Sequence, residues 1–439
     1  MEKTQKTDLE KKNINIKLFP FYKMISWDLL FYYAIIFLYL VEVKHLSAQQ
    51  VLLAEALYNV AIMIFIIPSG KIVDKIGKKN SVIIANICVS ASIAIMLVMK
   101  SFSHLIIAYT AMAFGYSIKA IAENIILYDS LPSGTKKGKI FSTIDGKASS
   151  YYYYLDAISA IVTGFLYVIN PYIPIALCLL MCIISTVLAC RFQHTNTVEK
   201  TKTDKSNEKV TLKEAFKHVN GSKRIQYLIL FYAICSGLLY VLSTLRSSLF
   251  EDLNLNAQYF GIIYAVLQVI SGITARYQNK IQNKFKNETL AILTIPLTLS
   301  CVFIGILGGL KPDDNFIFSV IIILFIMQNV IKGPYRSLII RYMNNFTNKS
   351  IRTKLATIES LAYYSVTVLF SLICSYLLGK TTTANTFIIV GIVSTFLLGI
   401  LLYIMKGKVG LQPEQYSAED LQYSHINREK TDSTKIDNK

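Results

Sequence analysis

A chain of 439 residues that is 53% hydrophobic and 16% charged, with a mean hydropathy of +0.46, is too apolar for a soluble globular protein. Its formal net charge of +18 does not indicate nucleic-acid binding, because the basic residues are spread over short polar loops rather than gathered in one patch. We therefore expect a multi-pass membrane protein whose loops contact anionic lipid headgroups.

Apolar runs of about 20 residues recur along almost the whole chain, and a helix of that length crosses a hydrocarbon core of about 30 Å. The first run is not followed by a small-residue cleavage site, so we expect it to be retained as a membrane helix. The sequence thus predicts an all-α membrane protein with twelve transmembrane helices. The predicted spans are Met24–Val43, Gln50–Ser69, Asn80–Val98, Leu105–Leu131, Phe141–Ile169, Tyr172–Phe192, Ile225–Phe250, Tyr259–Tyr277, Thr289–Leu310, Phe316–Tyr342, Leu355–Leu378 and Thr386–Met405.

The loops between these spans alternate between strongly and weakly basic. Lysine and arginine are frequent in the N-terminal arm, in every second loop and in the tail. The opposite loops hold one lysine each at most, namely Lys44, Lys100, Lys311 and Lys380. By the positive-inside rule both termini are cytoplasmic, and we expect the protein in the cell membrane.

One long polar segment divides the predicted spans six and six. The expected parts are a disordered arm at 1–18, a bundle at 19–192, a cytoplasmic linker at 193–224, a second bundle at 225–406 and a disordered tail at 407–439. In the linker Leu212, Ala215, Phe216 and Val219 share one helical face, which predicts an amphipathic helix on the membrane surface.

The loop after the second span reads Gly70-Lys71-Ile72-Val73-Asp74-Lys75-Ile76-Gly77-Lys78-Lys79. An ordinary basic loop would explain the lysines, but it would not explain an aspartate between two glycines. We expect the two glycines, Gly70 and Gly77, to permit close approach of the helices. The spacing G-x-x-x-D-[RK]-x-G-[RK]-[RK] resembles the signature loop of the major facilitator superfamily of secondary transporters. Its members Gly70, Asp74, Lys75, Gly77, Lys78 and Lys79 form a candidate cytoplasmic gate.

Short sequences of the first half recur in the second half in the same order. Tyr33-Ala34-Ile35 recurs as Tyr232-Ala233-Ile234, and Thr143-Ile144-Asp145 recurs as Thr357-Ile358-Glu359. These matches predict two pseudo-symmetric six-helix bundles, as the resemblance implies.

Ionisable residues fall on seven of the predicted spans, while the third, sixth, ninth and twelfth carry none in their interiors. Because buried charge in a membrane faces a protein interior or an aqueous cavity, this spacing predicts a central cavity lined by the charged helices. The candidate cavity residues are Asp28, Glu55, Tyr152, Arg246, Gln328, Asn329, Lys332, Arg336 and Glu359. Tyr152 is open to two interpretations, aromatic packing or substrate stacking, and Lys332, Arg336 and Glu359 form either a structural pair or a substrate site.

Three charged residues lie at mid-membrane depth on the fourth and fifth spans. Lys119 and Glu123 are one helical turn apart, about 6 Å, and Asp156 reaches a similar depth. Lys119 and Glu123 either neutralise each other or leave one carboxylate free to take a proton. We predict that Asp156 and Glu123 carry protons and that Lys119 tunes them. Asp145, Ser149, Tyr152 and Asp156 share one face and form a polar track from the cytoplasm.

The resemblance also implies a contact that closes the cytoplasmic side, and the sequence departs from the family pattern at two positions. The carboxylate of Asp74 is expected to accept from the N-terminus of the eleventh span near Lys354 and to close the cytoplasmic side. Ala111 stands where the family's fourth-helix arginine motif would have its arginine, and no proline lies between Gly146 and Gly164, where drug antiporters have a Gly-Pro motif.

Three function classes follow. The first is a proton-coupled exporter of amphipathic compounds or drugs, since the fourth span resembles that of drug antiporters. The second is a transporter of organic anions, because Arg246, Lys332 and Arg336 are basic. The weakest is a membrane enzyme or receptor, since nucleotide-loop, G-x-S-x-G and H-E-x-x-H motifs are missing.

We expect no cofactor, metal or nucleic acid as partner. The seven cysteines lie in apolar runs, where they act as small hydrophobic residues, and no histidine lies inside a span. The expected partners are a small-molecule substrate, protons and the lipid bilayer, and we expect a monomer.

Overall fold

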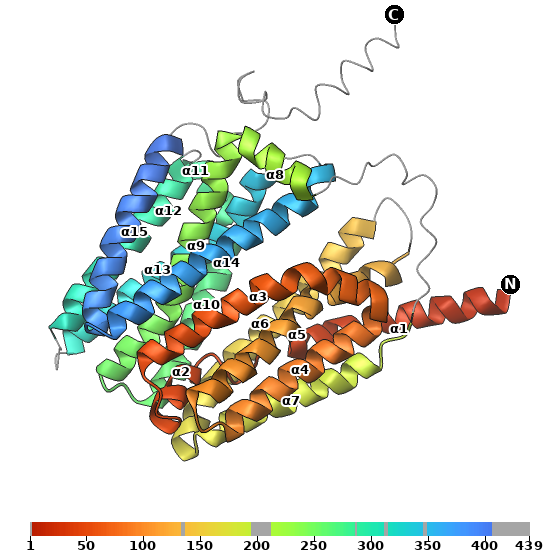
Figure 1. Ribbon diagram of the computed structural model, residues 1–439, viewed down its shortest axis with the longest axis horizontal. Helices are drawn as coiled ribbons and strands as arrows, with labels where there is room; N and C mark the ends of the chain where they lie inside the picture. The colour runs from red at the N-terminus through yellow and green to blue at the C-terminus, as the bar shows by residue number, and fades with distance from the viewer. Residues whose placement is uncertain are drawn as a thin grey trace, which may run out of the picture. The chain divides into compact units, whose positions relative to one another are not determined.

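The computed structural model describes residues 2–132, 137–194, 212–285, 288–310, 315–345 and 349–405, and most of these residues lie in helices (Figure 1). Eleven helices in the described ranges are long and apolar enough to cross a membrane, which confirms every predicted span except the first. They are α3 (Ala48–Ile76), α4 (Lys78–Val98), α5 (Phe102–Ser130), α6 (Lys137–Ile169), α7 (Tyr172–Cys190), α9 (Lys223–Asp252), α10 (Ala257–Arg276), α12 (Thr289–Gly309), α13 (Asn315–Asn345), α14 (Lys349–Leu378) and α15 (Thr383–Met405).

The prediction of one continuous first span over Met24–Val43 is wrong. Helix α1 (Glu2–Ser26) ends early, turns occupy residues 27–35, and the chain continues through α2 (Ile36–Leu38) and the π-helix η1 (Tyr39–Val43). Phe31 in this break has a φ of +60°, a left-handed value that an ordinary side chain rarely adopts. Non-helical backbone at membrane depth requires partners from the protein, so the neighbouring helices must supply them.

Helix α1 also begins earlier than the predicted first span. It starts at Glu2, in a region where the sequence predicts a disordered arm over residues 1–18. Its anchor is Asn15, whose side chain is fully buried. The amide of Asn15 donates to Ser130 Oγ at 3.1 Å and to the carbonyl of Gln193 at 3.1 Å, and its oxygen accepts from the Gln193 N–H at 2.7 Å. Three hydrogen bonds to these two residues hold α1 in a stretch where apolar periodicity is weak.

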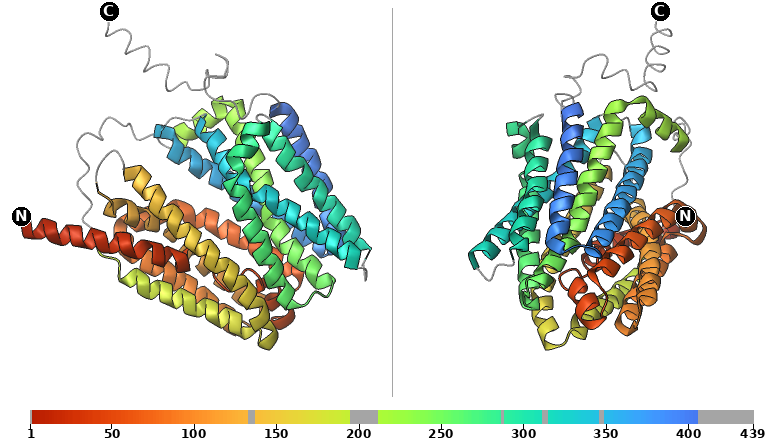
Figure 2. Two further views of the ribbon diagram at one scale, coloured as in Figure 1. Left: turned by 180° about the vertical axis from the view of Figure 1, so that it is seen from behind. Right: turned by 60° about the vertical axis from the view of Figure 1, so that its left-hand side comes forward.

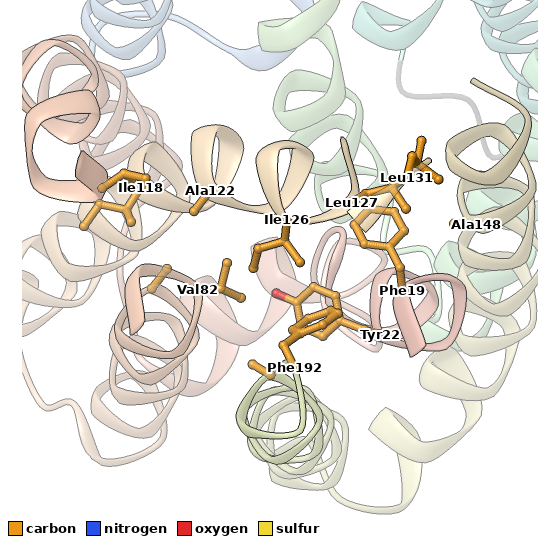
Figure 3. Packing of buried hydrophobic residues seen from close by; sticks show 13 residues of the cluster. Phe19, Tyr22, Val82, Ile118, Ala122, Ile126, Leu127, Leu131, Ala148 and Phe192 are labelled. Atoms are coloured by element: carbon orange, nitrogen blue, oxygen red, sulfur yellow. The ribbon is translucent and has the colours of Figure 1, made fainter. Parts of the chain in front are cut away.

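Inside the first part of the chain, α4 packs against α5 and α7, and α3 packs against α5 (Figures 1 and 2). Helix α1 contacts α5, α6 and α7. Figure 3 shows Phe19 and Tyr22 of α1 packed beside Ile126 and Leu127 of α5, with Phe192 next to the ring of Tyr22. This core fixes the position of α1, and with it the depth of Ser26, where the break begins.

The close helix approach expected at Gly70 and Gly77 is wrong. A Cβ at either glycine would meet no described atom within 4 Å. Gly77 is required for a different reason, since it ends α3 with a φ of +83°. The close approach lies at Gly115 of α5, where a Cβ would stand 2.7 Å from the carbonyl oxygen of Ala85 on α4.

The chain divides into two compact units. The first comprises Met1–Thr203, Ser243–Val269 and Ser371–Lys380, and the second comprises Asp204–Leu242, Ile270–Phe370 and Thr381–Lys439. These bounds differ from the predicted bundles, and the division into pseudo-symmetric halves stays a prediction.

Within the second unit α12 packs against α15 and α13, and the short helix α11 (Gln278–Phe285) contacts α12 and α13. The predicted linker helix is present as α8 (Leu212–Gly221). Ala215 and Val219 on its apolar face are buried, whereas Phe216 is 42% exposed. Part of that face therefore packs against protein, and contact of this helix with the membrane surface stays a prediction.

Candidate functional site

A buried polar network joins α1, α4, α5 and α7 in the first unit. Tyr22 donates its phenol O–H to Glu123 Oε1 at 2.5 Å and accepts from the side-chain amide of Asn86 at 2.8 Å. The oxygen of the same amide accepts from Ser185 Oγ at 3.4 Å. Glu123 is 8% exposed and Asn86 is 2% exposed, so this network holds a carboxyl group away from solvent. Such a group is stable only with partners, and Tyr22 and Lys119 are those partners.

Lys119 joins this network to the break in the first membrane segment. Its ammonium lies 3.7 Å from Glu123 Oε1 and donates to the backbone carbonyl of Ser26, the last residue of α1. A helix C-terminus presents unpaired carbonyls and a partial negative charge, so a buried cation there is favourable. The predicted pairing of Lys119 with Glu123 is present, and the lysine also caps a helix end that the sequence did not predict.

A second ion pair joins α1 and α6 next to this network. Lys23 of α1 lies 2.5 Å from Asp145 Oδ1 on α6, and its ammonium stands 4.8 Å from the centre of the Trp27 ring. Asp145 is the outer member of the predicted polar track. The side chain of Ser149, the next member, lies outside the described residues.

Asp28 lies inside the break, two residues after the end of α1. Its Oδ1 accepts three hydrogen bonds, from Tyr33 O–H at 2.5 Å, from Tyr116 O–H at 2.9 Å and from the N–H of Leu29 at 2.9 Å. Nearby, the N–H of Phe31 donates to Ser159 Oγ of α6 at 3.5 Å. The neighbouring helices α5 and α6 therefore hold the irregular backbone and orient the carboxylate.

In the tyrosine run Tyr151–Tyr154 on α6, the buried Tyr152 contacts Trp27 in the break of the first membrane segment. Tyr152 is 5% exposed and makes an edge contact with Trp27 at 5.2 Å, whereas Tyr153 and Tyr154 are 54% and 70% exposed. Tyr153 also packs edge-on against Trp27 at 5.1 Å. Aromatic packing is thus observed for Tyr152, and substrate stacking stays a prediction.

Asp156 is buried one turn beyond Tyr152 on α6. Its charge acts on the phenols of Tyr152 and Tyr264, and Tyr264 also interacts with the charges of Asp28 and Arg246. These residues all belong to the first unit. Asp156, Asp28 and Arg246 thus interact with one shared tyrosine, Tyr264.

Glu55 of α3 is held by a hydroxyl. Thr244 Oγ1, in the part of α9 that belongs to the same unit, lies 2.8 Å and 2.9 Å from the two carboxylate oxygens of Glu55. This predicted residue therefore has a defined partner.

The remaining predicted residues lie in the second unit. Gln328 donates to Ser300 Oγ at 3.0 Å, and Asn329 donates to the Phe325 carbonyl at 2.9 Å while it accepts from Ser271 Oγ. Both side chains therefore join neighbouring helices. Lys332 is exposed, Glu359 is half-buried, and the side chain of Arg336 lies outside the described residues.

The predicted signature loop is mostly helical, since Gly70–Ile76 end α3, Lys78 and Lys79 begin α4, and only Gly77 lies between the two helices. Asp74 and Lys75 are exposed, Lys79 is half-buried, and Lys78 pairs with Asp129 at the end of α5. The side chain of Lys354 lies outside the described residues, so the latch through Asp74 stays a prediction.

Several site residues were missed from the sequence. Tyr22 and Lys23 precede the predicted first span, and Tyr33, Asn86 and Tyr116 carry no charge. A signal for Tyr22 was present, because Asn15, Phe19, Tyr22 and Ser26 lie at spacings of three and four and share one helical face.

Comparison with known proteins gives the family and supports the fold. No curated protein matches the sequence. The fold is similar to that of the nucleoside transporter NupG, with a TM-score of 0.72 and 11% identity over 90% of this chain and 100% of that one. It is also similar to a D-xylose-proton symporter (TM-score 0.64, 12% identity, 93% of this chain and 98% of that chain) and to the peptide transporter POT in complex with sulfate (TM-score 0.63, 13% identity, 90% and 94%). The family model of the Major Facilitator Superfamily matches residues 23–313, more than half of the chain, and the protein belongs to this superfamily.

Proposed function

We propose that this protein exports amphipathic small molecules in exchange for protons. Family membership and the eleven apolar helices make it a multi-pass membrane protein and a transporter rather than an enzyme. Proteins of similar fold include transporters of nucleosides, peptides and D-xylose. The proposal adds three points to this: protons are the coupling ion, the direction of transport is export, and the substrates are amphipathic small molecules.

The contact of Lys119 with both Glu123 and the Ser26 carbonyl carries the proposal. When Glu123 takes up a proton, its charge no longer balances that of Lys119. Lys119 then interacts more strongly with the end of α1 and with the break that follows it. Because Asp28 and Trp27 lie in this break, a proton on Glu123 alters the surroundings of a substrate bound there.

Asp156 supplies a second carboxylate for the proton. It lies one turn from Tyr152, which contacts Trp27, so its protonation acts on the same aromatic residues. The roles of Asp156 and Glu123 in carrying protons and of Lys119 in tuning them are kept as part of the proposal.

Purified protein in proteoliposomes with an imposed pH gradient tests this function. Wild type is expected to concentrate amphipathic compounds and to dissipate the gradient as it does so. The double variant Asp156→Asn/Glu123→Gln should lose gradient-driven accumulation and keep substrate exchange at equal pH. Asp252→Asn, at the exposed end of α9, is the matched control. Continued accumulation by the double variant would place proton coupling elsewhere.

The organic-anion alternative has no supporting observation of its own. Arg246 belongs to the first unit and Lys332 to the second, and the side chain of Arg336 is not described. Exchange of labelled carboxylates in the same proteoliposomes, without response to amines or alcohols, would favour this alternative over the exporter.

A further inference from the structure

Only one of the two carboxylate oxygens of Asp28 accepts hydrogen bonds from the described residues. All three of its hydrogen bonds go to Oδ1, while Oδ2 accepts none from the described part of the chain. A carboxylate offers acceptor sites on both oxygens. Tyr33, Tyr116 and the backbone of Leu29 therefore fix the orientation of Asp28 and leave one oxygen open to a donor from outside the chain.

The neighbouring lysines are committed to other groups. Lys119 pairs with Glu123 and caps the Ser26 carbonyl, and Lys23 pairs with Asp145 at 2.5 Å. Within the described ranges no lysine or arginine lies within salt-bridge distance of Asp28. Phenol and amide donors therefore hold its negative charge, and in the described part of the chain no lysine or arginine forms an ion pair with it.

Aromatic rings surround this carboxylate. Trp27 precedes it in the chain and contacts Tyr152 and Tyr153 edge-on at 5.2 Å and 5.1 Å. Tyr33 and Tyr116 reach it through their hydroxyls. Aromatic faces attract cations, and a carboxylate with an open oxygen attracts the N–H groups of an ammonium.

We propose that Asp28 binds the ammonium group of a monovalent amphipathic amine through Oδ2, and that the apolar part of the amine packs against Trp27 and Tyr152. This inference names the substrate class of the proposed export function and rests on that function for the transport step. The chemistry of the site disfavours an anionic group at this position, because it would meet a carboxylate that forms no ion pair with a described lysine or arginine.

The same geometry explains how a proton would displace the amine. Lys119 lies 5.4 Å from the centre of the Tyr116 ring, and the hydroxyl of Tyr116 donates to Asp28. A proton taken up by Glu123 leaves the charge of Lys119 uncompensated beside the bound ammonium, which repels it. One proton enters as one monovalent cation leaves, so the total charge of the site is unchanged over the exchange.

Trp27 provides the measurement, because it is the single tryptophan of the chain and lies next to Asp28. We would titrate the purified full-length protein in nanodiscs with 4-phenylbutylammonium, 4-phenylbutanol and 4-phenylbutanoate and follow Trp27 fluorescence. The three probes share one aromatic group and differ in charge. The ammonium is expected to bind more tightly than the alcohol by about tenfold or more, as for a hydrogen bond to a charged group, and the carboxylate most weakly.

Variants decide whether Asp28 is the cause. Asp28→Asn should remove the preference for the ammonium over the alcohol, Asp28→Glu should keep it, and the exposed control Asp252→Asn should leave it unchanged. The inference is overturned if no probe binds, if the three bind equally, or if Asp28→Asn elutes as folded protein and keeps the preference. Retained Asp28-dependent binding without pH-driven transport in proteoliposomes would instead reject the export function alone.

Discussion

At the scale of single residues, Lys119 connects the buried polar network of the first unit to the break after α1. It pairs with Glu123 at 3.7 Å, donates to the carbonyl of Ser26 and stands 5.4 Å from the ring of Tyr116. It is also 4% exposed. A buried charge of this kind is stable because of its partners, so the effect of a substitution depends on what is left behind.

Replacing Lys119 by methionine is expected to lower the free energy of unfolding by about 3–5 kcal/mol, because Glu123 then keeps a buried charge without its cation. Lys119→Met/Glu123→Gln should recover part of this loss. Thermal unfolding of the two single variants and the double variant in detergent measures the coupling, with the exposed Lys217→Met as control. Additive effects of the two single substitutions would show that the two side chains do not interact.

At the scale of helices, the crossing of α4 and α5 sets the spacing of the first unit. At Gly115 a Cβ would lie 2.7 Å from the carbonyl oxygen of Ala85, whereas at Gly399 of α15 it would meet nothing within 4 Å. Both glycines lie inside helices, where alanine is intrinsically the better residue by about 1 kcal/mol. Opposite effects of one substitution are therefore expected at the two positions.

Gly115→Ala is expected to destabilise the protein by about 1–3 kcal/mol through overpacking, while Gly399→Ala should stabilise it or have no effect. The shift in melting temperature of each variant in the same detergent is the measurement. A stabilised Gly115→Ala protein would mean that α4 and α5 separate at little cost and that their close approach is not required.

At the scale of the whole molecule, alternating access requires a gate on the cytoplasmic side. The turn at Gly77 brings α3 directly into α4 and leaves Asp74 exposed, while Lys78 pairs with Asp129 of α5. An exposed carboxylate next to a rigid turn is available to a helix N-terminus, as the family resemblance implies for the eleventh predicted span.

Asp74→Asn is therefore expected to leave the protein folded and inserted and to favour the inward-open state. Labelling of a single cysteine, placed at the cytoplasmic end of a helix in a cysteine-free variant, should become faster with a membrane-impermeant reagent. Asp252→Asn serves again as the charge-matched control. An unchanged labelling rate would remove the latch from the transport cycle.

The sequence by itself determined the fold class and eleven of the membrane helices, because an apolar run of about 20 residues has only the helix available to satisfy its backbone in a bilayer. It also predicted the helix α8, whose signal is local. Of the site, it identified the charges of Lys119, Glu123 and Asp156, which are buried, and that of Asp28, which is half-buried.

Only the tertiary structure decided where the first membrane segment breaks and which groups complete the site. The break depends on Lys119 meeting the Ser26 carbonyl across 93 residues of sequence, and the network depends on Tyr22 meeting Glu123 across 101. The hydropathy of a segment does not indicate which distant residues will contact it. The run Met24–Val43 reads as one apolar helix, yet it breaks at Ser26 because neighbouring helices supply hydrogen bonds that replace those of a continuous helix.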